Sequence, residues 1–134
     1  YCPVHREITP QLLEQAKKKY PQAEVLVHPE CVQKVLQQAD FIGSTSEILR
    51  HAEQSFQKEF IIGTEEGVLY ELKKKCPDKI FHCVMEGQCC SDMKKVTLEK
   101  VRDSLKNGTY EIQLPEVVSQ KALKALDTML ELAK

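Results

Sequence analysis

Four short apolar runs, each followed by a stretch with helical spacing, set the pattern of this sequence. The runs recur about every 16 to 20 residues and cover residues 23–27, 40–43, 59–63 and 79–84. Strands that alternate with helices of this length predict parallel pairing, because a parallel return needs a long crossover. The runs are almost continuously apolar, as expected for strands that are covered on both faces. The pattern therefore predicts an α/β fold with three layers, α/β/α, around a four-stranded parallel sheet.

Capping and stop residues mark the ends of the expected helices. Thr9 followed by Pro10 predicts the start of a helix over 11–20, and Pro21 ends it. Further helices are expected over 30–38, from Thr45 or Ser46 to about 56, over 66–75 and over 98–105. Pro115 opens a long last helix. Its apolar positions repeat at helical spacing and predict a face packed into a core: Val118, Ala122, Ala125, Leu126, Met129 and Leu130.

Composition narrows the class of protein. With 134 residues, 42% hydrophobic and 29% charged, the chain has the make-up of one globular domain. A formal net charge of -1 gives no basic footprint for nucleic acid, and no apolar run approaches the roughly 20 residues that span a bilayer. With no visible export signal, we expect the cytoplasm. Thiols stay reduced there, so the six cysteines indicate ligands or catalysts rather than disulfides.

Polar and reactive side chains follow each expected strand. His-Pro-Glu-Cys over 28–31 follows the first, Gly-Ser-Thr-Ser over 43–46 the second, Gly-Thr-Glu over 63–65 the third, and a loop to Cys89-Cys90 the fourth. Because the carboxyl ends of parallel strands meet at one edge of a sheet, these groups should converge there. His28 and Glu30 flank a proline that fixes the turn, so an imidazole and a carboxylate would face one pocket.

The Gly-Ser-Thr-Ser segment has two interpretations. Small residues that enter a helix expose backbone N–H groups and hydroxyls, which can hold a carboxylate or a phosphate. Ser44 or Thr45 could equally be an ordinary helix N-cap. The segment with Thr64 carries the same ambiguity, and Glu65 fits a charge in the first turn of a helix.

The cysteines lack the spacing of a common zinc motif. Cys89 and Cys90 are adjacent, so we expect one to be a ligand and the other incidental, whereas Cys31 should be a small buried residue. Residues alone leave two alternatives to an enzyme: a flavodoxin-like module that binds an anion or regulates through thiols, and a zinc site of Cys89 or Cys90 with His28. Three histidines receive no role: His5, His51 and His82.

Five motifs, taken in order, closely resemble the C-terminal half of quinolinate synthases over residues 1 to about 98. They are Cys2-Pro3-Val4-His5, His28-Pro29-Glu30-Cys31, Ala39-Asp40 leading to Gly43-Ser44-Thr45-Ser46, Gly63-Thr64-Glu65, and Cys90-x-x-Met93-Lys94 followed by Thr97-Leu98. The resemblance implies condensation of iminoaspartate with dihydroxyacetone phosphate to quinolinate, in NAD biosynthesis. It also implies a fold of three similar α/β domains around a 4Fe-4S cluster.

The resemblance implies a role for each matched residue. Each domain would supply one cysteine to the cluster, here Cys2 and Cys90 with Cys89 as the fallback, and one iron would stay open as a Lewis acid. Glu30 would be an acid/base group, and His28 would act with it at the reacting centre. The substrate-binding residues would be His28, Ser44, Thr45, Thr64 and Met93.

The resemblance implies that the sequence divides into three parts. Residues 1–22 would be the tail of the preceding middle domain with a linking helix, 23–106 the C-terminal α/β domain, and 107–134 a helical extension that packs on the enzyme body. The chain starts at Tyr1 followed by Cys2, so we expect a piece of the enzyme that is inactive without its N-terminal domains. L-Aspartate oxidase or aspartate dehydrogenase would supply iminoaspartate, and neither nucleic acid nor a membrane is an expected partner.

Overall fold

The computed structural model describes residues 2–133, and the chain divides between Lys94 and Lys95 into two compact units. The first unit contains all four strands of the sheet, and the second contains two helices. The elements of the first unit are α1 (Pro3–Glu7), α2 (Pro10–Lys19), β1 (Glu24–Val27), α3 (Gln33–Leu36), β2 (Phe41–Ile42), α4 (Thr45–Gln54), β3 (Glu59–Gly63), α5 (Val68–Lys75) and β4 (Ile80–Cys83).

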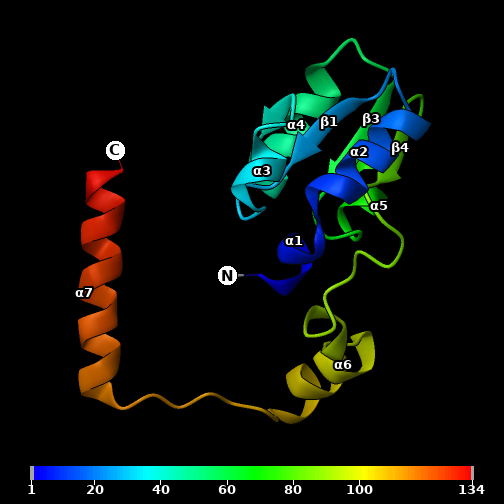
Figure 1. The fold of residues 1–134 in the computed structure, drawn as a ribbon. Coiled ribbons are helices and arrows are strands. Elements are labelled where there is room, and N and C mark those ends of the chain that lie inside the picture. The colour runs from blue at the N-terminus through cyan, green and yellow to red at the C-terminus, as the bar shows by residue number, and fades with distance from the viewer. Residues whose placement is uncertain (1, 134) are drawn as a thin grey trace. The chain divides into compact units, whose positions relative to one another are not determined.

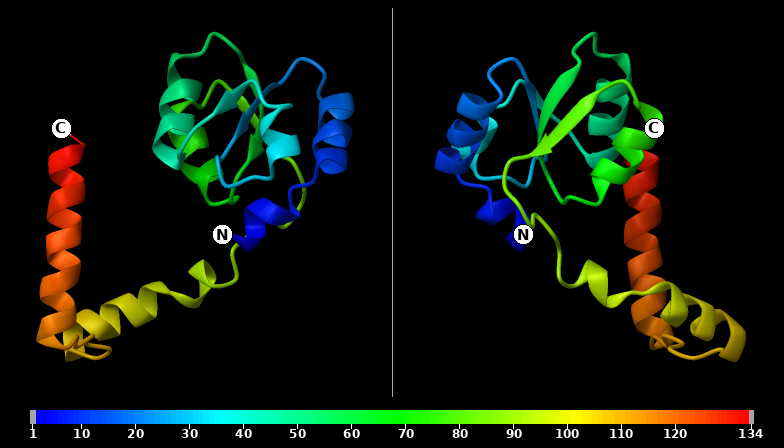
Figure 2. Two further views of the ribbon diagram at one scale, coloured as in Figure 1. Left: turned by 60° about the vertical axis from the view of Figure 1, so that its left-hand side comes forward. Right: turned by 90° about the vertical axis from the view of Figure 1, so that its right-hand side faces the viewer.

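The sheet is parallel throughout, with the strand order β2-β1-β3-β4. Helices α2 and α3 cover one face, and α4 and α5 cover the other (Figures 1 and 2). The predicted three-layer α/β/α fold with a four-stranded parallel sheet is therefore confirmed.

Two apolar clusters, one on each face of the sheet, hold the layers together. Successive residues of β1 alternate between them: Val25 and Val27 pack under α2 and α3, whereas Leu26 packs under α4 and α5. In β3, Ile61 belongs to the first cluster and Phe60 to the second, and all five side chains are fully buried. The continuous apolar runs follow from this arrangement, because both faces of each central strand are covered.

The strand order places a topological switch point between β1 and β3. The chain leaves β1 toward β2 on one side and then crosses back to form β3 on the other side of β1. At such a point the loops after the two central strands diverge and leave a crevice beyond their carboxyl ends. Here those loops begin at His28 and at Thr64, so the fold directs both toward one crevice.

Several element ends differ from the sequence prediction. The helix expected over 30–38 is only α3, Gln33–Leu36, because residues 28–31 form a turn in which the Cys31 N–H donates to the His28 carbonyl at 3.0 Å. The strand expected over 40–43 is reduced to the two residues of β2 at the sheet edge. Helix α1 was not predicted, although Pro3 at its first turn is a recognised start signal.

The second unit contains α6 (Leu98–Asn107) and α7 (Glu116–Leu132). Both helices form where the sequence predicts them, with Thr97 capping α6 and Gly108 ending it in the left-handed conformation at φ 63°. The apolar stripe of the last helix is exposed within the second unit, and its predicted packing on an enzyme body stays a prediction. The residues of this stripe are Val118, Ala122, Ala125, Leu126, Met129 and Leu130.

The division at Lys94 differs from the boundaries inferred from the resemblance. Helix α2, expected to link two domains, packs through Leu13 and Ala16 into the first cluster of the α/β unit. Helix α6, expected in the α/β domain, belongs to the second unit. The domain boundaries of the complete enzyme stay a prediction.

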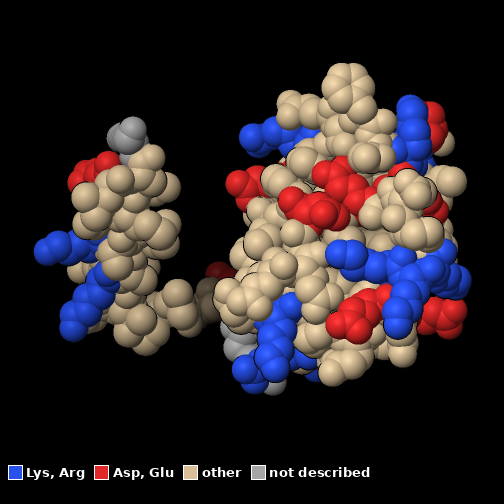
Figure 3. All heavy atoms as spheres, turned by 45° about the horizontal axis from the view of Figure 1, so that its top comes forward, with Lys and Arg blue, Asp and Glu red and all other residues tan. Residues whose placement is uncertain are grey.

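The surface shows charges of both signs. On the face seen in Figure 3, Lys and Arg side chains lie among Asp and Glu side chains instead of forming a separate basic field. Among the helices of the described chain, none combines the length and the hydropathy that crossing a membrane requires.

Candidate functional site

A cavity of about 520 Å³ lies beyond the carboxyl ends of the strands in the first unit. Loops after β1, β3 and β4, the start of α4 and helix α1 all contribute to its wall. The predicted site residues that line it are Cys2, His28, Glu30, Thr45, Thr64, Cys90 and Met93. The convergence that the strand-end argument predicts is therefore found for these seven residues. Their chemical roles stay predictions.

The turn after β1 fixes the orientation of His28 and Glu30. The His28 N–H donates to the Gly63 carbonyl at 3.1 Å, which extends the pairing of β1 with β3. The Glu30 N–H donates to His28 Nδ1 at 3.3 Å, and this leaves Nε2 as the protonated ring nitrogen. The His28 side chain is 19% exposed and that of Glu30 is 44% exposed. An imidazole and a carboxylate thus stand together at the cavity.

His5 is the residue of this site that sequence reasoning missed. It is 6% exposed, its ring stacks on His28 with centroids 4.4 Å apart, and its Nε2 lies 2.9 Å from Thr64 Oγ1. Its Nδ1 lies 3.2 Å from Glu30 Oε2, and the two form an ion pair when the imidazole is protonated. Burial and the neighbouring His28 ring lower the pKa of His5. The signal available in the sequence was the Cys2-x-x-His5 spacing, which places both residues on one face of a helical turn.

Glu65 ties the loop that carries Cys90 to the end of β3. Its Oε1 accepts the Cys90 N–H at 3.4 Å and lies 3.4 Å from Lys94 Nζ, while Oε2 accepts the Gly67 N–H at 2.7 Å. The Glu65 carboxylate also raises the pKa of Lys94. The sequence position of Glu65 suggested only a charge in the first turn of a helix. Its carboxylate instead connects the loop after β3 to the loop that carries Cys90.

Gln88 supports the same loop from the interior. Its side chain is 1% exposed, and its Nε2 donates to the carbonyls of Ile62 and Thr64. Its Oε1 accepts the Met85 N–H at 3.3 Å, and its carbonyl accepts the Glu66 N–H at 2.7 Å. These bonds satisfy a buried amide and fix the path of the chain two residues before Cys90.

Ser44 and Thr45 separate into different structural roles. Ser44 is the N-cap of α4: its Oγ accepts the Glu47 N–H at 3.4 Å, and its own N–H donates to Glu47 Oε2 at 2.7 Å. This capping box engages the Ser44 side chain outside the cavity. Thr45, the first helical residue, lines the cavity instead. The Ser44 hydroxyl is therefore the helix cap, and substrate binding by Ser44 and Thr45 stays a prediction.

The remaining candidates differ in exposure. Met93 lines the cavity from a short 3-10 helix and is 60% exposed. Cys89 is partly exposed and does not line the cavity, unlike its neighbour Cys90. Between the two adjacent cysteines, the structure thus favours Cys90 as the residue that serves the site.

Comparison with known proteins decides the family. A family model described as quinolinate synthetase A protein matches residues 1–131. The chain belongs to the quinolinate synthetase A family. This result favours an enzyme over the flavodoxin-like binding module that the residues alone left open.

Curated relatives of the quinolinate synthetase A family align along nearly the whole chain. The quinolinate synthase of Caldicellulosiruptor bescii is 49% identical over 132 residues, which cover 98% of this chain and 44% of that protein. Quinolinate synthase 2 of Methanosarcina acetivorans is 47% identical over 133 residues, 99% of this chain and 43% of that protein. The enzyme of Clostridioides difficile is 44% identical over 134 residues, 100% of this chain and 44% of that protein. The chain therefore spans less than half the length of these relatives.

The 4Fe-4S cluster implied by the family resemblance needs thiolate ligands at one place. Cys2 and Cys90 come from opposite ends of the first unit, and both line the cavity. Among residues 2–133 no third cysteine lines it. The donor set of this quinolinate synthetase A chain therefore fits one side of a cluster, and a further thiolate would have to come from outside residues 2–133.

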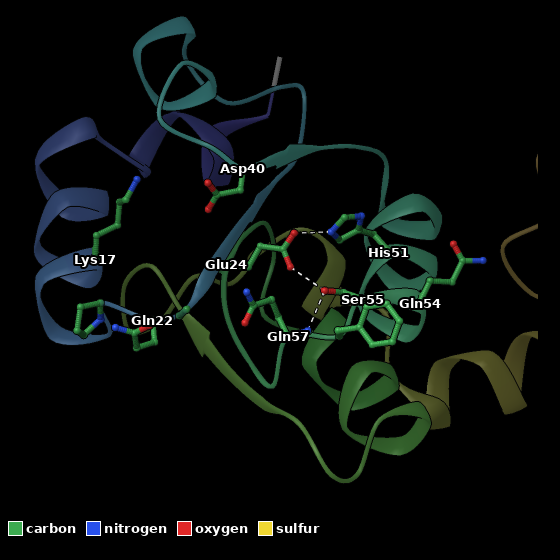
Figure 4. A pocket seen from close by; sticks show the side chains of 11 residues that line it. Lys17, Gln22, Glu24, Asp40, His51, Gln54, Ser55 and Gln57 are labelled. Atoms are coloured by element: carbon green, nitrogen blue, oxygen red, sulfur yellow. Dashed lines mark hydrogen bonds and ion pairs between the residues drawn. The ribbon is translucent and has the colours of Figure 1, made fainter.

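A second and larger cavity, of about 750 Å³, lies near the amino ends of the strands (Figure 4). Its central carboxylate, Glu24, accepts hydrogen bonds from Ser55 Oγ at 2.9 Å and lies 2.6 Å from His51 Nε2. Ser55 and His51 both bind the carboxylate and not each other, as Figure 4 shows, so they do not form a nucleophile–base pair. In this quinolinate synthetase A chain, the cavity's polar groups tie β1 to α4.

Burial of Cys31 should make the stability of this chain depend on pH above 9. The thiol donates to the Gly63 carbonyl at 3.5 Å, and burial raises its pKa from 9.0 to about 11. As the pH rises, the unfolded chain therefore loses the thiol proton before the folded chain does. The contribution of the buried thiol to the free energy of unfolding is complete below pH 9.0 and is lost as the pH rises toward 11. In urea titrations between pH 9 and pH 11, we expect the free energy of unfolding to fall by about 2 kcal/mol more in wild type than in Cys31→Ala. Equal losses would contradict the assignment.

Proposed function

We propose that this chain forms part of a quinolinate synthase, which condenses iminoaspartate with dihydroxyacetone phosphate to quinolinate. One observation carries the proposal: Cys2, Cys90, His28, Glu30 and Thr45 line a single cavity at the switch point of the sheet. The names of the relatives support the enzyme class. The proposal extends to the cytoplasm as its compartment, and to L-aspartate oxidase or aspartate dehydrogenase as the source of iminoaspartate.

The chemistry at this cavity would divide between a cluster and the chain's own side chains. Cys2 and Cys90 would hold a 4Fe-4S cluster, which supplies a Lewis acid when bound. His28 would donate from Nε2 to a substrate carboxylate or carbonyl oxygen, because its Nδ1 is already occupied by the Glu30 N–H. Glu30 is half-exposed at the cavity and would exchange a proton with the substrate.

Thr45 would bind an anionic group of the substrate. It is the first residue of α4, where backbone N–H groups without helical partners and the positive end of the helix dipole attract a carboxylate or a phosphate. The Thr45 hydroxyl adds a further donor at the same place. Thr64 and Met93 would complete the wall beside this group.

The experiment compares Thr45→Ala with its neighbour Ser44→Ala in the complete enzyme. Loss of a hydrogen bond to a charged group costs about 1.5–3 kcal/mol, so we expect Thr45→Ala to lower kcat/KM by roughly 10- to 100-fold with iron content unchanged. Ser44→Ala removes a helix cap, and we expect it to lower the free energy of unfolding by about 1 kcal/mol with kcat/KM unchanged.

The kcat/KM values of the two variants also show how the assignment of Thr45 to substrate binding would fail. Equal kcat/KM for Thr45→Ala and wild type would remove Thr45 from substrate binding. A kinetic defect confined to Ser44→Ala would transfer the anion contact to the capping serine.

A further inference from the structure

The ring of His5 contacts both side chains to which the proposed function assigns proton transfer and hydrogen bonding. It stacks on His28 with centroids 4.4 Å apart and an angle of 9° between the ring planes. Its Nδ1 lies 3.2 Å from Glu30 Oε2. Two contacts of different kinds therefore connect one imidazole to His28 and to Glu30, so the orientation of His5 affects where both side chains point.

Burial separates His5 from the two side chains that it contacts. The His5 side chain is 7% exposed, whereas those of His28 and Glu30 are 19% and 44% exposed. Thr64, whose Oγ1 lies 2.9 Å from His5 Nε2, is 3% exposed. A substrate in the cavity therefore reaches His28 and Glu30 more readily, and His5 and Thr64 can act on it through them.

The Glu30 carboxylate favours one tautomer of His5. A carboxylate only accepts hydrogen bonds, so its oxygen beside Nδ1 stabilises the form of the imidazole that carries its proton on Nδ1. The lone pair then lies on Nε2, and the Thr64 hydroxyl donates to it. Because buried polar atoms are nearly always hydrogen-bonded, this donor holds the His5 ring at one rotation about its Cβ–Cγ bond.

The end of β3 fixes the position of the Thr64 hydroxyl. Thr64 is the first residue after the strand, and its carbonyl accepts a hydrogen bond from the buried amide of Gln88. The preceding carbonyl, that of Gly63, accepts the His28 N–H at 3.1 Å. The backbone at Thr64 and the turn that carries His28 are therefore joined by hydrogen bonds, and the hydroxyl has a defined place relative to both rings.

We propose that Thr64 and His5 are positioning residues for the reaction at this cavity. The Thr64 hydroxyl holds the His5 ring through Nε2, and His5 orients His28 by stacking and Glu30 through Nδ1. The inference rests on the proposed function, which gives His28 and Glu30 their chemical roles. It differs from the substrate contact that the family resemblance implies for Thr64.

Two substitutions at Thr64 separate the role of its hydroxyl from that of its packing. Thr64→Val keeps the branched shape and removes the donor, whereas Thr64→Ser keeps the donor and removes a methyl group. In the complete enzyme, we expect Thr64→Val to lower kcat by roughly 10- to 100-fold with KM within about twofold of wild type, because misoriented groups impair the reacting step. Thr64→Ser should restore most of kcat. Both variants should keep the iron content of wild type.

A double-mutant cycle tests whether Thr64 acts through His5. His5→Phe keeps a ring that can stack on His28 and removes both ring nitrogens. We expect it to lower kcat about as much as Thr64→Val does, and we expect the double variant to show no further loss, because the second residue has lost its target. Far-UV circular dichroism verifies that each variant is folded, and the Thr64 pair decides the question if His5→Phe does not fold.

The ring nitrogens of His5 give a readout that does not depend on turnover. Their ¹⁵N chemical shifts can be measured on the 134-residue chain at about pH 8, where ordinary imidazoles are neutral. We expect a protonated Nδ1 and an unprotonated, hydrogen-bonded Nε2 in wild type. Thr64→Val should move the Nε2 resonance to that of a nitrogen without a donor, and Thr64→Ser should leave it in place.

Several outcomes would overturn the proposal. Wild-type kcat in Thr64→Val would show that the hydroxyl is not needed, and a raised KM with unchanged kcat would make Thr64 a substrate-binding residue. A larger kcat loss in Thr64→Ser than in Thr64→Val would assign the effect to packing. Loss of iron in Thr64→Val would assign it to the cysteine loop. A wild-type spectrum with the proton of His5 on Nε2 would contradict the assigned donor.

Failure of the proposed function would give a different pattern. A wild-type complete enzyme that forms no quinolinate would refute the condensation. The ¹⁵N spectra of the 134-residue chain would then still decide whether the Thr64 hydroxyl donates to His5. Conversely, normal turnover in every Thr64 variant would remove the positioning role and leave the proposed function standing.

Discussion

Cys90→Ser in the complete enzyme is expected to give a colourless protein with almost no bound iron after anaerobic reconstitution. Serine replaces the soft thiolate that an iron–sulfur cluster requires with a hard, neutral hydroxyl. The Cys90 loop is held at the cavity by Glu65 and Gln88, so moving another thiol into the position of Cys90 would break these hydrogen bonds. Iron analysis and the visible spectrum measure the result.

Cys89→Ser is the matched control for this prediction. It makes the same chemical change one residue earlier, on a side chain that does not line the cavity. We expect it to retain the iron content and the colour of wild type. Normal iron in Cys90→Ser together with loss in Cys89→Ser would transfer the ligand role to Cys89.

Phe60→Ala is expected to have the largest effect on stability. Phe60 lies on the central strand β3, is fully buried, and stacks on Phe81 with centroids 5.4 Å apart. Truncating a buried phenylalanine removes its transfer free energy and leaves a cavity, at a cost of about 3–5 kcal/mol. The total free energy of unfolding of a small domain is about 5–15 kcal/mol. Urea denaturation should therefore show that Phe60→Ala retains only a small free energy of unfolding.

Phe56→Ala makes the same substitution on an exposed side chain. Phe56 is 100% exposed in the loop between α4 and β3. Its replacement should change the free energy of unfolding by no more than about 0.5 kcal/mol. Comparable losses in the two variants would mean that the apolar cluster of Leu26, Phe60 and Ile62 does not stabilise the fold as described.

The predictions that succeeded depend on local patterns. Apolar runs at β1 and β3, separated by helices with recognisable caps, are sufficient to predict parallel pairing and both covered faces. The rule that strand ends share one edge then predicts a common cavity for groups such as Glu30, Thr45 and Cys90, and they do line one cavity.

The sequence left alternatives open, or misplaced the end of an element, where a local pattern has two physical outcomes. An apolar stripe on α7 indicates only that the helix needs a partner surface, and it does not identify that surface. Ser44 and Thr45 are chemically alike, and a difference of one residue in the start of α4 decides which of them caps the helix. Helix α3 is short because the turn over 28–31 takes residues that its sequence would allow in a helix.

By itself, the sequence determined the α/β class, the family motifs and the edge of the sheet where reactive groups gather, because each follows from spacing along the chain. Only the tertiary structure decided that His5 pairs with Thr64, 59 residues away, and that its other ring nitrogen lies 3.2 Å from the Glu30 carboxylate. The same holds for Glu65 and Gln88, which fix the Cys90 loop. Contacts between distant residues depend on how the layers close, and no spacing rule within one segment contains that information.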